Sequence, residues 1–233
     1  GQKATHEFLS ALNDFYRTSR FNDFFNTHTD IYELGLQVFN DSVMAHFDQE
    51  WYTRFYGTPP AEQFRIIIGF TNGPCNYGPS RKLTGQPKEV FAIMNYAVDD
   101  NERPIFYKKV VETVVHEFCH SFTKIKGDTE KALEKSGKAL QEYTYFSMRR
   151  QAYSTWRNIL EESLVRAATI CYLIDHDYDE KDIRNAIIEQ VDRNFFWMPE
   201  LVQTLRYYES HRKKYPTFTS FYPEIIRFFD RYV

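Results

Sequence analysis

The sequence has no long hydrophobic run, little cysteine and no strong excess of one charge. No stretch approaches the roughly 20 uncharged apolar residues that span a bilayer, so we expect no membrane-spanning segment. A formal net charge of −3 gives no reason to expect nucleic acid as a partner. The 3 cysteines cannot all pair within one chain, and their spacing forms no CxxC motif, which excludes a disulfide scaffold.

Aromatic side chains are plentiful instead. The 233 residues include 21 Phe, 17 Tyr and 3 Trp, while 42% hydrophobic and 26% charged residues are typical of a globular protein. We expect most of the aromatic rings to pack in the core rather than to line a groove. A chain of this length can form one sizeable domain, and we expect a single domain over residues 1–233.

The pattern of apolar residues changes along the chain. They recur at helical spacing from residue 4 to about 56, and Gly57 ends this region. The segments 64–70 and 89–95 are short, β-branched and aromatic, as is typical of strands, and the loop 71–88 joins them. The sequence therefore predicts an α+β architecture in three parts: helical (1–60), a small sheet (61–100) and helical again (101–233).

The last part is predicted to be helical throughout. Pro104 stands near the start of its first helix, and Gly127 stands near the end of that helix. The further helices predicted by periodicity cover 129–148, 151–175, 179–192, 199–214 and 221–231.

The first helix of this part carries the motif His116-Glu117-Phe118-Cys119-His120. Residues four apart lie one turn above each other on a helix, so both imidazoles can face a single ion. Neutral imidazole is a preferred ligand of zinc. Glu117 follows the first histidine directly, where it can take a proton from water without ligating the metal. The alternative interpretation is a pair of surface histidines on an amphipathic helix.

The residues around the motif favour the metal interpretation. With Val110 at zero on a helical wheel, the valines and phenylalanines from Val110 to Phe122 lie between about 0° and 140°. His116 falls at about 240° and His120 at about 280° on the same wheel. One face of the helix is therefore expected to pack in the core, and the opposite face is expected to border a cleft.

A catalytic zinc site usually has three protein ligands and one open position, so a third ligand is needed. We expect Glu162, because it lies away from the apolar stripe of its own helix and because Arg166, one turn later, can hold its carboxylate. Glu161 and Glu142 stay open as alternatives. If Glu161 is no ligand, we expect it to be an ordinary surface residue.

Together these residues resemble the gluzincin clan of metallopeptidases, which is defined by HExxH and a distant glutamate. The blocks 114–122 and 162–167 and the loop 76–80 are also similar to a family of bacterial domains of unknown function that is regarded as zincin-like. The resemblance covers residues from about 20 to 215. It implies a zincin-like α+β fold, predominantly helical, with a small sheet before the HExxH helix. Many gluzincins have Asp where Arg166 stands, so the surroundings of the glutamate differ.

The resemblance implies a zinc-dependent hydrolase, a metallopeptidase with Zn2+ on His116, His120 and Glu162 and with Glu117 as general base, acting on a peptide or protein. Tyr77 can donate a hydrogen bond to the oxyanion, although it can equally be a turn residue beside Gly78. His176 and His211 are alternatives for that role. The strand 89–95, or its partner, is expected to pair with extended substrate.

Two other functions stay open at this point. One is a non-catalytic zinc-containing domain that binds a protein or glycan, although a purely structural site does not need Glu117. The other is a zinc hydrolase of non-peptide substrates. Since members of the similar family are typically exported, the resemblance also implies a periplasmic, cell-surface or secreted protein whose signal is missing from this chain. A cytoplasmic location and the oligomeric state stay open.

Overall fold

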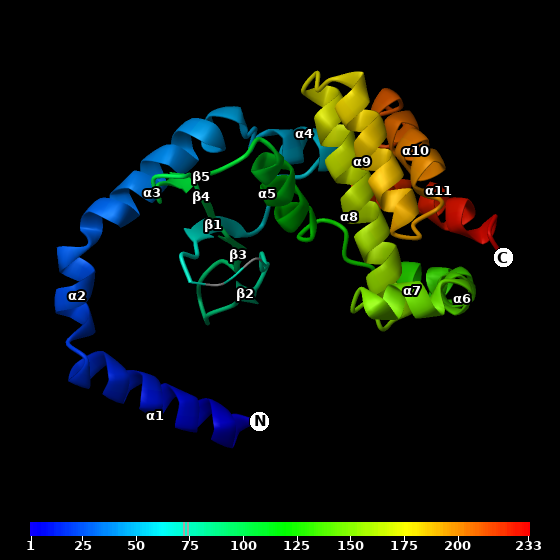
Figure 1. The fold of residues 1–233 in the computed structure, drawn as a ribbon. Coiled ribbons are helices and arrows are strands. Elements are labelled where there is room, and N and C mark those ends of the chain that lie inside the picture. Colours follow the sequence, from blue (N-terminus) through cyan, green and yellow to red (C-terminus); the bar gives the residue numbers. More distant parts are fainter. Residues whose placement is uncertain (72, 74) are drawn as a thin grey trace.

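The computed structural model describes residues 1–71, 73 and 75–233. Helices dominate this part of the chain, and small sheets lie between the N-terminal and C-terminal helices (Figure 1). The architecture is therefore α+β, as the sequence predicts. The helices are α1 (Gln2–Thr18), α2 (Phe21–Thr27), α3 (Thr29–Ser42), η1 (Met44–His46), α4 (Trp51–Tyr56), α5 (Lys109–Cys119), α6 (Asp128–Tyr143), α7 (Tyr145–Arg150), α8 (Trp156–Asp175), α9 (Glu180–Asp192), α10 (Met198–Ser210) and α11 (Phe218–Asp230).

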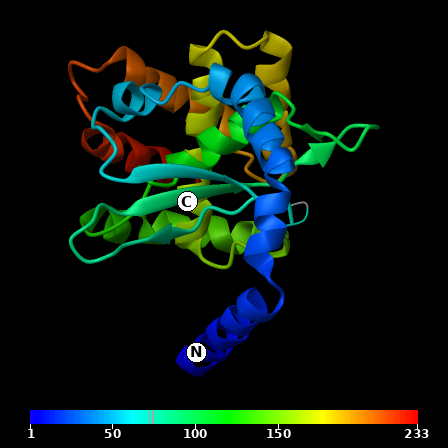
Figure 2. The same ribbon diagram turned by 90° about the vertical axis from the view of Figure 1, so that its left-hand side faces the viewer.

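The first helices form an arm that projects from the rest of the molecule. In both views α1 lies apart from the sheet and from the C-terminal helices (Figures 1 and 2). Residues 1–31 are all exposed, whereas Phe39 and Trp51 are buried in the core. Helix α4 ends at Tyr56, where Gly57 adopts a left-handed conformation with φ of 73°. The predicted stop at Gly57 is therefore confirmed, but only the later part of the predicted helical region contributes to the core.

A three-stranded sheet has the order β1-β3-β2. Strand β1 (Gln63–Ile68) pairs parallel to β3 (Glu89–Met94), and the short β2 (Ser80–Arg81) pairs antiparallel to β3. Strand β3 is therefore the central strand. Its Val90, Ala92 and Met94 are buried, as the alternation of a half-buried strand requires.

Helix α5 packs against β3 and against α8. Val111, Val114 and Val115 are fully buried, and the Phe118 ring stacks on Phe64 of β1 with 4.2 Å between ring centroids. The face of α5 that the wheel assigns to the core is thus the face that packs. Helix α8 also contacts α6, α9 and α10, so it lies at the centre of the C-terminal helices. Of the 41 Phe, Tyr and Trp side chains, 17 are buried and 9 more pack partly buried against the core, which agrees with the predicted aromatic core.

Several predicted helix boundaries are wrong. Pro104 does not open a helix but lies in β5 (Pro104–Ile105), which pairs with β4 (Ala97–Val98). The reason is a turn in which the Asp99 carboxylate accepts backbone N–H groups of Asn101 and Arg103.

The helix that follows this hairpin is shorter than predicted at both ends. Helix α5 begins at Lys109 and ends at Cys119, long before Gly127, which is the N-cap of α6. Turn hydrogen bonds from Ser121 to Phe118 and from Phe122 to Cys119 end α5. The predicted helix 129–148 divides into α6 and α7, and α8 begins after the N-cap Thr155 rather than at residue 151.

Candidate metal centre

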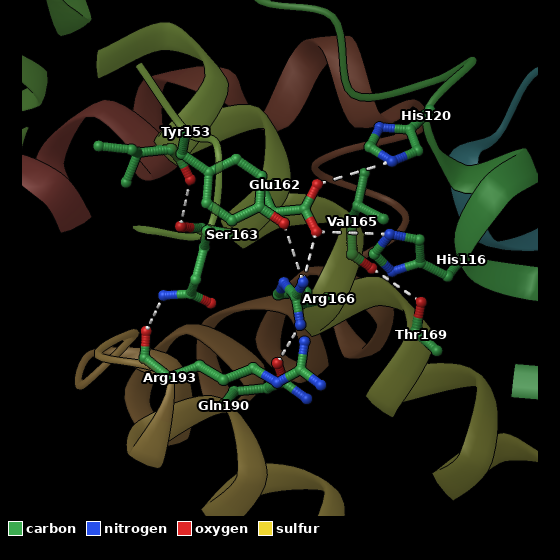
Figure 3. Close-up of polar contacts among 12 residues, drawn as sticks. His116, His120, Tyr153, Glu162, Ser163, Val165, Arg166, Thr169, Gln190 and Arg193 are labelled. Carbon is green, nitrogen blue, oxygen red and sulfur yellow. Dashed lines mark hydrogen bonds and ion pairs between the residues drawn. The ribbon is translucent and has the colours of Figure 1, made fainter. Parts of the chain in front are cut away.

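His116 of α5 and His120, the C-cap residue of that helix, face away from the core and toward α8. The Nε2 atom of His116 lies 3.4 Å from Glu162 Oε1, and the Nε2 atom of His120 lies 3.6 Å from Glu162 Oε2. One ligand atom from each of the three residues lies within 4.8 Å of the other two. Figure 3 shows both imidazole rings turned toward the Glu162 carboxylate. The structure therefore brings the three predicted ligands together as a group that could hold a metal ion.

The spacing of these atoms suits a single ion. Two ligand atoms about 2.1 Å from a tetrahedral ion lie roughly 3.4 Å apart, which is close to the distances that separate each imidazole from Glu162. Two histidines and one carboxylate are also a known ligand set of catalytic zinc, with a fourth position left for water. The residues present therefore fit a metal ion by both donor type and distance.

The histidines are neutral at physiological pH. Burial lowers the pKa of His116 to about 4 and also lowers the pKa of His120. Burial alone would raise the pKa of Glu162, but the positive charges that face it, on His116 when protonated and on Arg166, lower it. The cluster thus presents two neutral nitrogens and one carboxylate, the protonation states that bind a metal without first losing a proton.

Glu162 is held by Arg166, as its place one turn later on α8 predicts. The Arg166 side chain donates to Glu162 Oε1 at 2.8 Å, and both side chains are at least nine-tenths buried. Arg166 is held in turn by the Gln190 carboxamide of α9 and by the Tyr153 hydroxyl, which accepts at 3.0 Å. A hydrogen bond from Tyr153 also helps to lower the pKa of Glu162. Sequence reasoning missed Tyr153 and Gln190, because neither shows a local motif.

Glu117 borders the same space but is not part of the cluster. It makes no side-chain hydrogen bond within the described residues, and burial together with the nearby Glu162 raises its pKa to about 7. Gly78 approaches it so closely that a β-carbon at this position would overlap the Glu117 carboxylate. A carboxyl group with a pKa near neutrality, next to a possible metal site, has the properties of a general base.

The chain beside Glu117 is an edge of the sheet. The backbone of Tyr77 exchanges two hydrogen bonds with Ile93 of β3, N–H to O at 3.0 Å and O to N–H at 2.8 Å. By the alternation of an antiparallel pair, the N–H and C=O of Gly78 point away from β3. Strand β3 itself is central and cannot add a further strand. Of the two predicted options, its antiparallel partner is therefore the edge next to the cluster.

The rival ligands lie elsewhere. Glu161 accepts hydrogen bonds from the Ile125 backbone N–H at 2.9 Å and from Lys124 at 3.0 Å, while Glu142 is exposed on α6. Neither belongs to the group that the described residues form around His116. The expectation that Glu161 is an ordinary surface residue is wrong, because its side chain is only 14% exposed and holds the loop that follows α5.

Within the described residues, no hydrogen bond or ion pair joins the residues considered for the oxyanion to the cluster. Tyr77 is 49% exposed. His176 accepts or donates a hydrogen bond with Asp48 at 3.1 Å, and His211 bonds to the backbone of its own helix. The role of Tyr77 stays a prediction.

Comparison with known families gives one match. A family model described as a domain of unknown function (DUF4932) matches residues 2–228. The chain belongs to this family. Membership of DUF4932 agrees with the resemblance to a family of unknown function, and its description names no activity. No curated protein and no solved structure gives a significant match. Among the described residues, no helix is both long and apolar enough to cross a bilayer.

Proposed function

We propose that the chain is a zinc-dependent hydrolase, and specifically a metallopeptidase, in which His116, His120 and Glu162 hold the zinc ion. The observation that carries this proposal is the convergence of two neutral imidazoles and a buried carboxylate beside a second carboxyl group, Glu117, that ligates nothing. A bound zinc ion would supply Lewis acidity and lower the pKa of water.

Glu117 would act as the general base. With a pKa of about 7 it can take a proton from the attacking water and pass that proton to the leaving amine. Its lack of a side-chain partner within the described residues leaves both carboxylate oxygens available for this task. A purely structural metal site would gain nothing from such a group, which favours a catalytic centre over the non-catalytic alternative.

The edge beside Glu117 favours a peptide over other hydrolysable substrates. The N–H and C=O of Gly78 face away from β3, so an extended chain can pair with them as an added strand. Because Gly78 has no side chain, that backbone lies directly against Glu117. A peptide bound there would run past the carboxylate that must reach its scissile bond. Export, which the resemblance implies, stays an expectation.

The test combines metal loading with turnover. The zinc-loaded protein is incubated with a diverse peptide library, and the products are identified by mass spectrometry. Cleavage that disappears in Glu117→Gln while zinc stays bound would support the proposal. Wild-type cleavage in that variant would show that Glu117 is not the base. Zinc binding without cleavage of any peptide would favour one of the two alternatives, a non-catalytic domain or a hydrolase of other substrates.

A further inference from the structure

A groove of about 440 Å³ is lined by residues of α5, α8 and α9, among them His116 of the metal cluster. Thr169, Ile170 and Leu173 of α8 line it, and His116 and Glu117 line it as well. The groove therefore opens directly on the place where the proposed reaction would occur. A substrate side chain next to the scissile bond has this space available to it.

The cationic side chains that line the groove are all engaged. Lys109 of α5 reaches across to Glu189 of α9 at 2.9 Å, and Arg193 bonds the other oxygen of Glu189 at 2.8 Å. Arg166 is held by Glu162 at 2.8 Å and by Gln190. These pairs leave no cation of the lining without an anionic partner, so none of them is available to bind an acidic ligand.

Two carboxyl groups of the lining have no hydrogen-bond or ion-pair partner among the described residues: Glu117, the proposed general base, and Glu112. Glu112 lies on α5 one turn before His116, half-buried in the groove, and no hydrogen bond or ion pair joins its carboxylate to another described residue. Burial is the main cause that raises the pKa of Glu112, the nearby Lys109 opposes that rise, and Glu189 and Asp182 add to it. Burial removes part of the water from this carboxylate, so a ligand that brings a positive charge to it would be favourable.

We propose that this groove is the subsite for a lysine or arginine side chain of the substrate and that Glu112 is the residue that selects it. The inference rests on the proposed peptidase function and names its substrate class. Four residues of an α-helix rise about 6 Å, so Glu112 lies one turn from the metal-binding His116. The long stem of a basic side chain spans such a distance along Ile170 and Leu173, and its charged end meets Glu112.

The experiment measures the cleavage preference of the zinc-loaded protein and of three variants on a peptide library. The wild type is expected to prefer Lys or Arg at one position next to the cleaved bond. Glu112→Gln, which keeps the shape of the side chain, should lower kcat/KM for the basic peptides by about 10- to 100-fold, as expected for a lost charged hydrogen bond. The wild type and Glu112→Gln should cleave peptides with norleucine at that position equally well. Glu112→Lys should shift the preference toward Asp or Glu.

Glu180→Gln is the matched control, because Glu180 is a highly exposed carboxylate at the start of α9 whose partner is the exposed Arg184. It should leave the preference unchanged. If the wild type shows no basic preference, or if the preference survives in Glu112→Gln, the subsite assignment is overturned while the peptidase function stands.

If the protein cleaves none of the peptides, a binding measurement tests the subsite instead. Hydroxamates that carry either arginine or norleucine on each side of the zinc-binding group are titrated into the zinc-loaded protein by calorimetry. Tighter binding of the arginine compounds that is lost in Glu112→Gln supports the subsite without any turnover. Equal binding of the two side chains overturns it. A protein that binds neither zinc nor a hydroxamate contradicts the proposed function, and the subsite is then withdrawn with it.

Discussion

Arg166 and Glu162, one turn apart on α8, form a buried ion pair whose carboxylate also faces both histidines of the cluster. In the absence of metal, Arg166 supplies the only full positive charge in contact with that carboxylate among the described residues, because burial keeps His116 and His120 neutral at physiological pH. A metal ion would bring a second positive charge to the same oxygens. The ion pair and the metal therefore stabilise one buried anion together.

This relationship predicts how stability depends on the metal in Arg166→Leu. Removal of one partner of a buried pair costs about 3–5 kcal/mol, because the remaining charge is left uncompensated. We expect that loss in the metal-free protein and a clearly smaller loss with zinc, since zinc would neutralise Glu162. Denaturant unfolding with and without zinc measures both values. Arg184→Leu, which removes an exposed pair on α9, is the control and should change stability by less than about 0.5 kcal/mol. A loss of stability that zinc does not reduce would contradict the conclusion that Arg166 and the metal stabilise Glu162 together.

Glu117→Gln should stabilise the metal-free protein. The folded pKa of Glu117, about 7, lies above the ordinary value of 4.5, so the folded state binds the extra proton between these values and loses stability as pH rises through them. Above pH 7 the cost is fully present, and the uncharged amide removes it. We expect a gain of about 1–3 kcal/mol at pH 7.5 that falls toward zero near pH 4.5. Unfolding curves at both pH values check this. An equal effect at both would show that folding does not raise the pKa of Glu117.

Glu161→Ala should destabilise the fold while the zinc site persists. Its carboxylate accepts the backbone N–H of Ile125 and thereby fixes the loop after His120. Loss of a buried hydrogen bond that leaves a backbone donor unsatisfied costs about 1–3 kcal/mol. Thermal unfolding measures this cost, and a chelator competition measures the zinc affinity. An unchanged melting temperature would mean that the loop does not depend on this contact.

Gly78→Ala tests the close approach of the edge to the proposed base. A methyl group at this position would overlap the Glu117 carboxylate, so we expect turnover to fall by at least 10-fold with zinc still bound. Ser80→Ala, two residues further along the same edge and exposed, should keep normal turnover. Normal activity of Gly78→Ala would show that Glu117 can move without loss of function.

The parts of the site that lie on one helix could be predicted from the sequence. The helical spacing of His116 and His120, and of Glu162 and Arg166, fixes which side chains share a face, and both expectations agree with the contacts found. The contact between α5 and α8 follows only from the need for a third ligand, because periodicity does not indicate which helices pack together.

The features that sequence reasoning missed are tertiary. Tyr153 and Gln190 meet Arg166 only because α9 and the segment before α8 pack around it. The interaction of Glu161 with Ile125 joins residues 36 positions apart, which no local pattern reveals. The sequence predicts a helix start near Pro104, whereas α5 begins at Lys109, because Asp99 forms a turn whose hydrogen bonds compete with the helix.

The central claim is that His116, His120 and Glu162 bind one metal ion, and elemental analysis after zinc loading tests it most directly. We expect close to one zinc per chain in the wild type, in Glu161→Ala and in Glu142→Ala. Glu162→Ala should lose most of the metal in a chelator competition at pH 7, because two histidines remain as the only protein ligands in the cluster. A wild-type protein that retains no transition metal after zinc addition, or a Glu162→Ala variant that binds zinc as tightly as the wild type, would contradict the account.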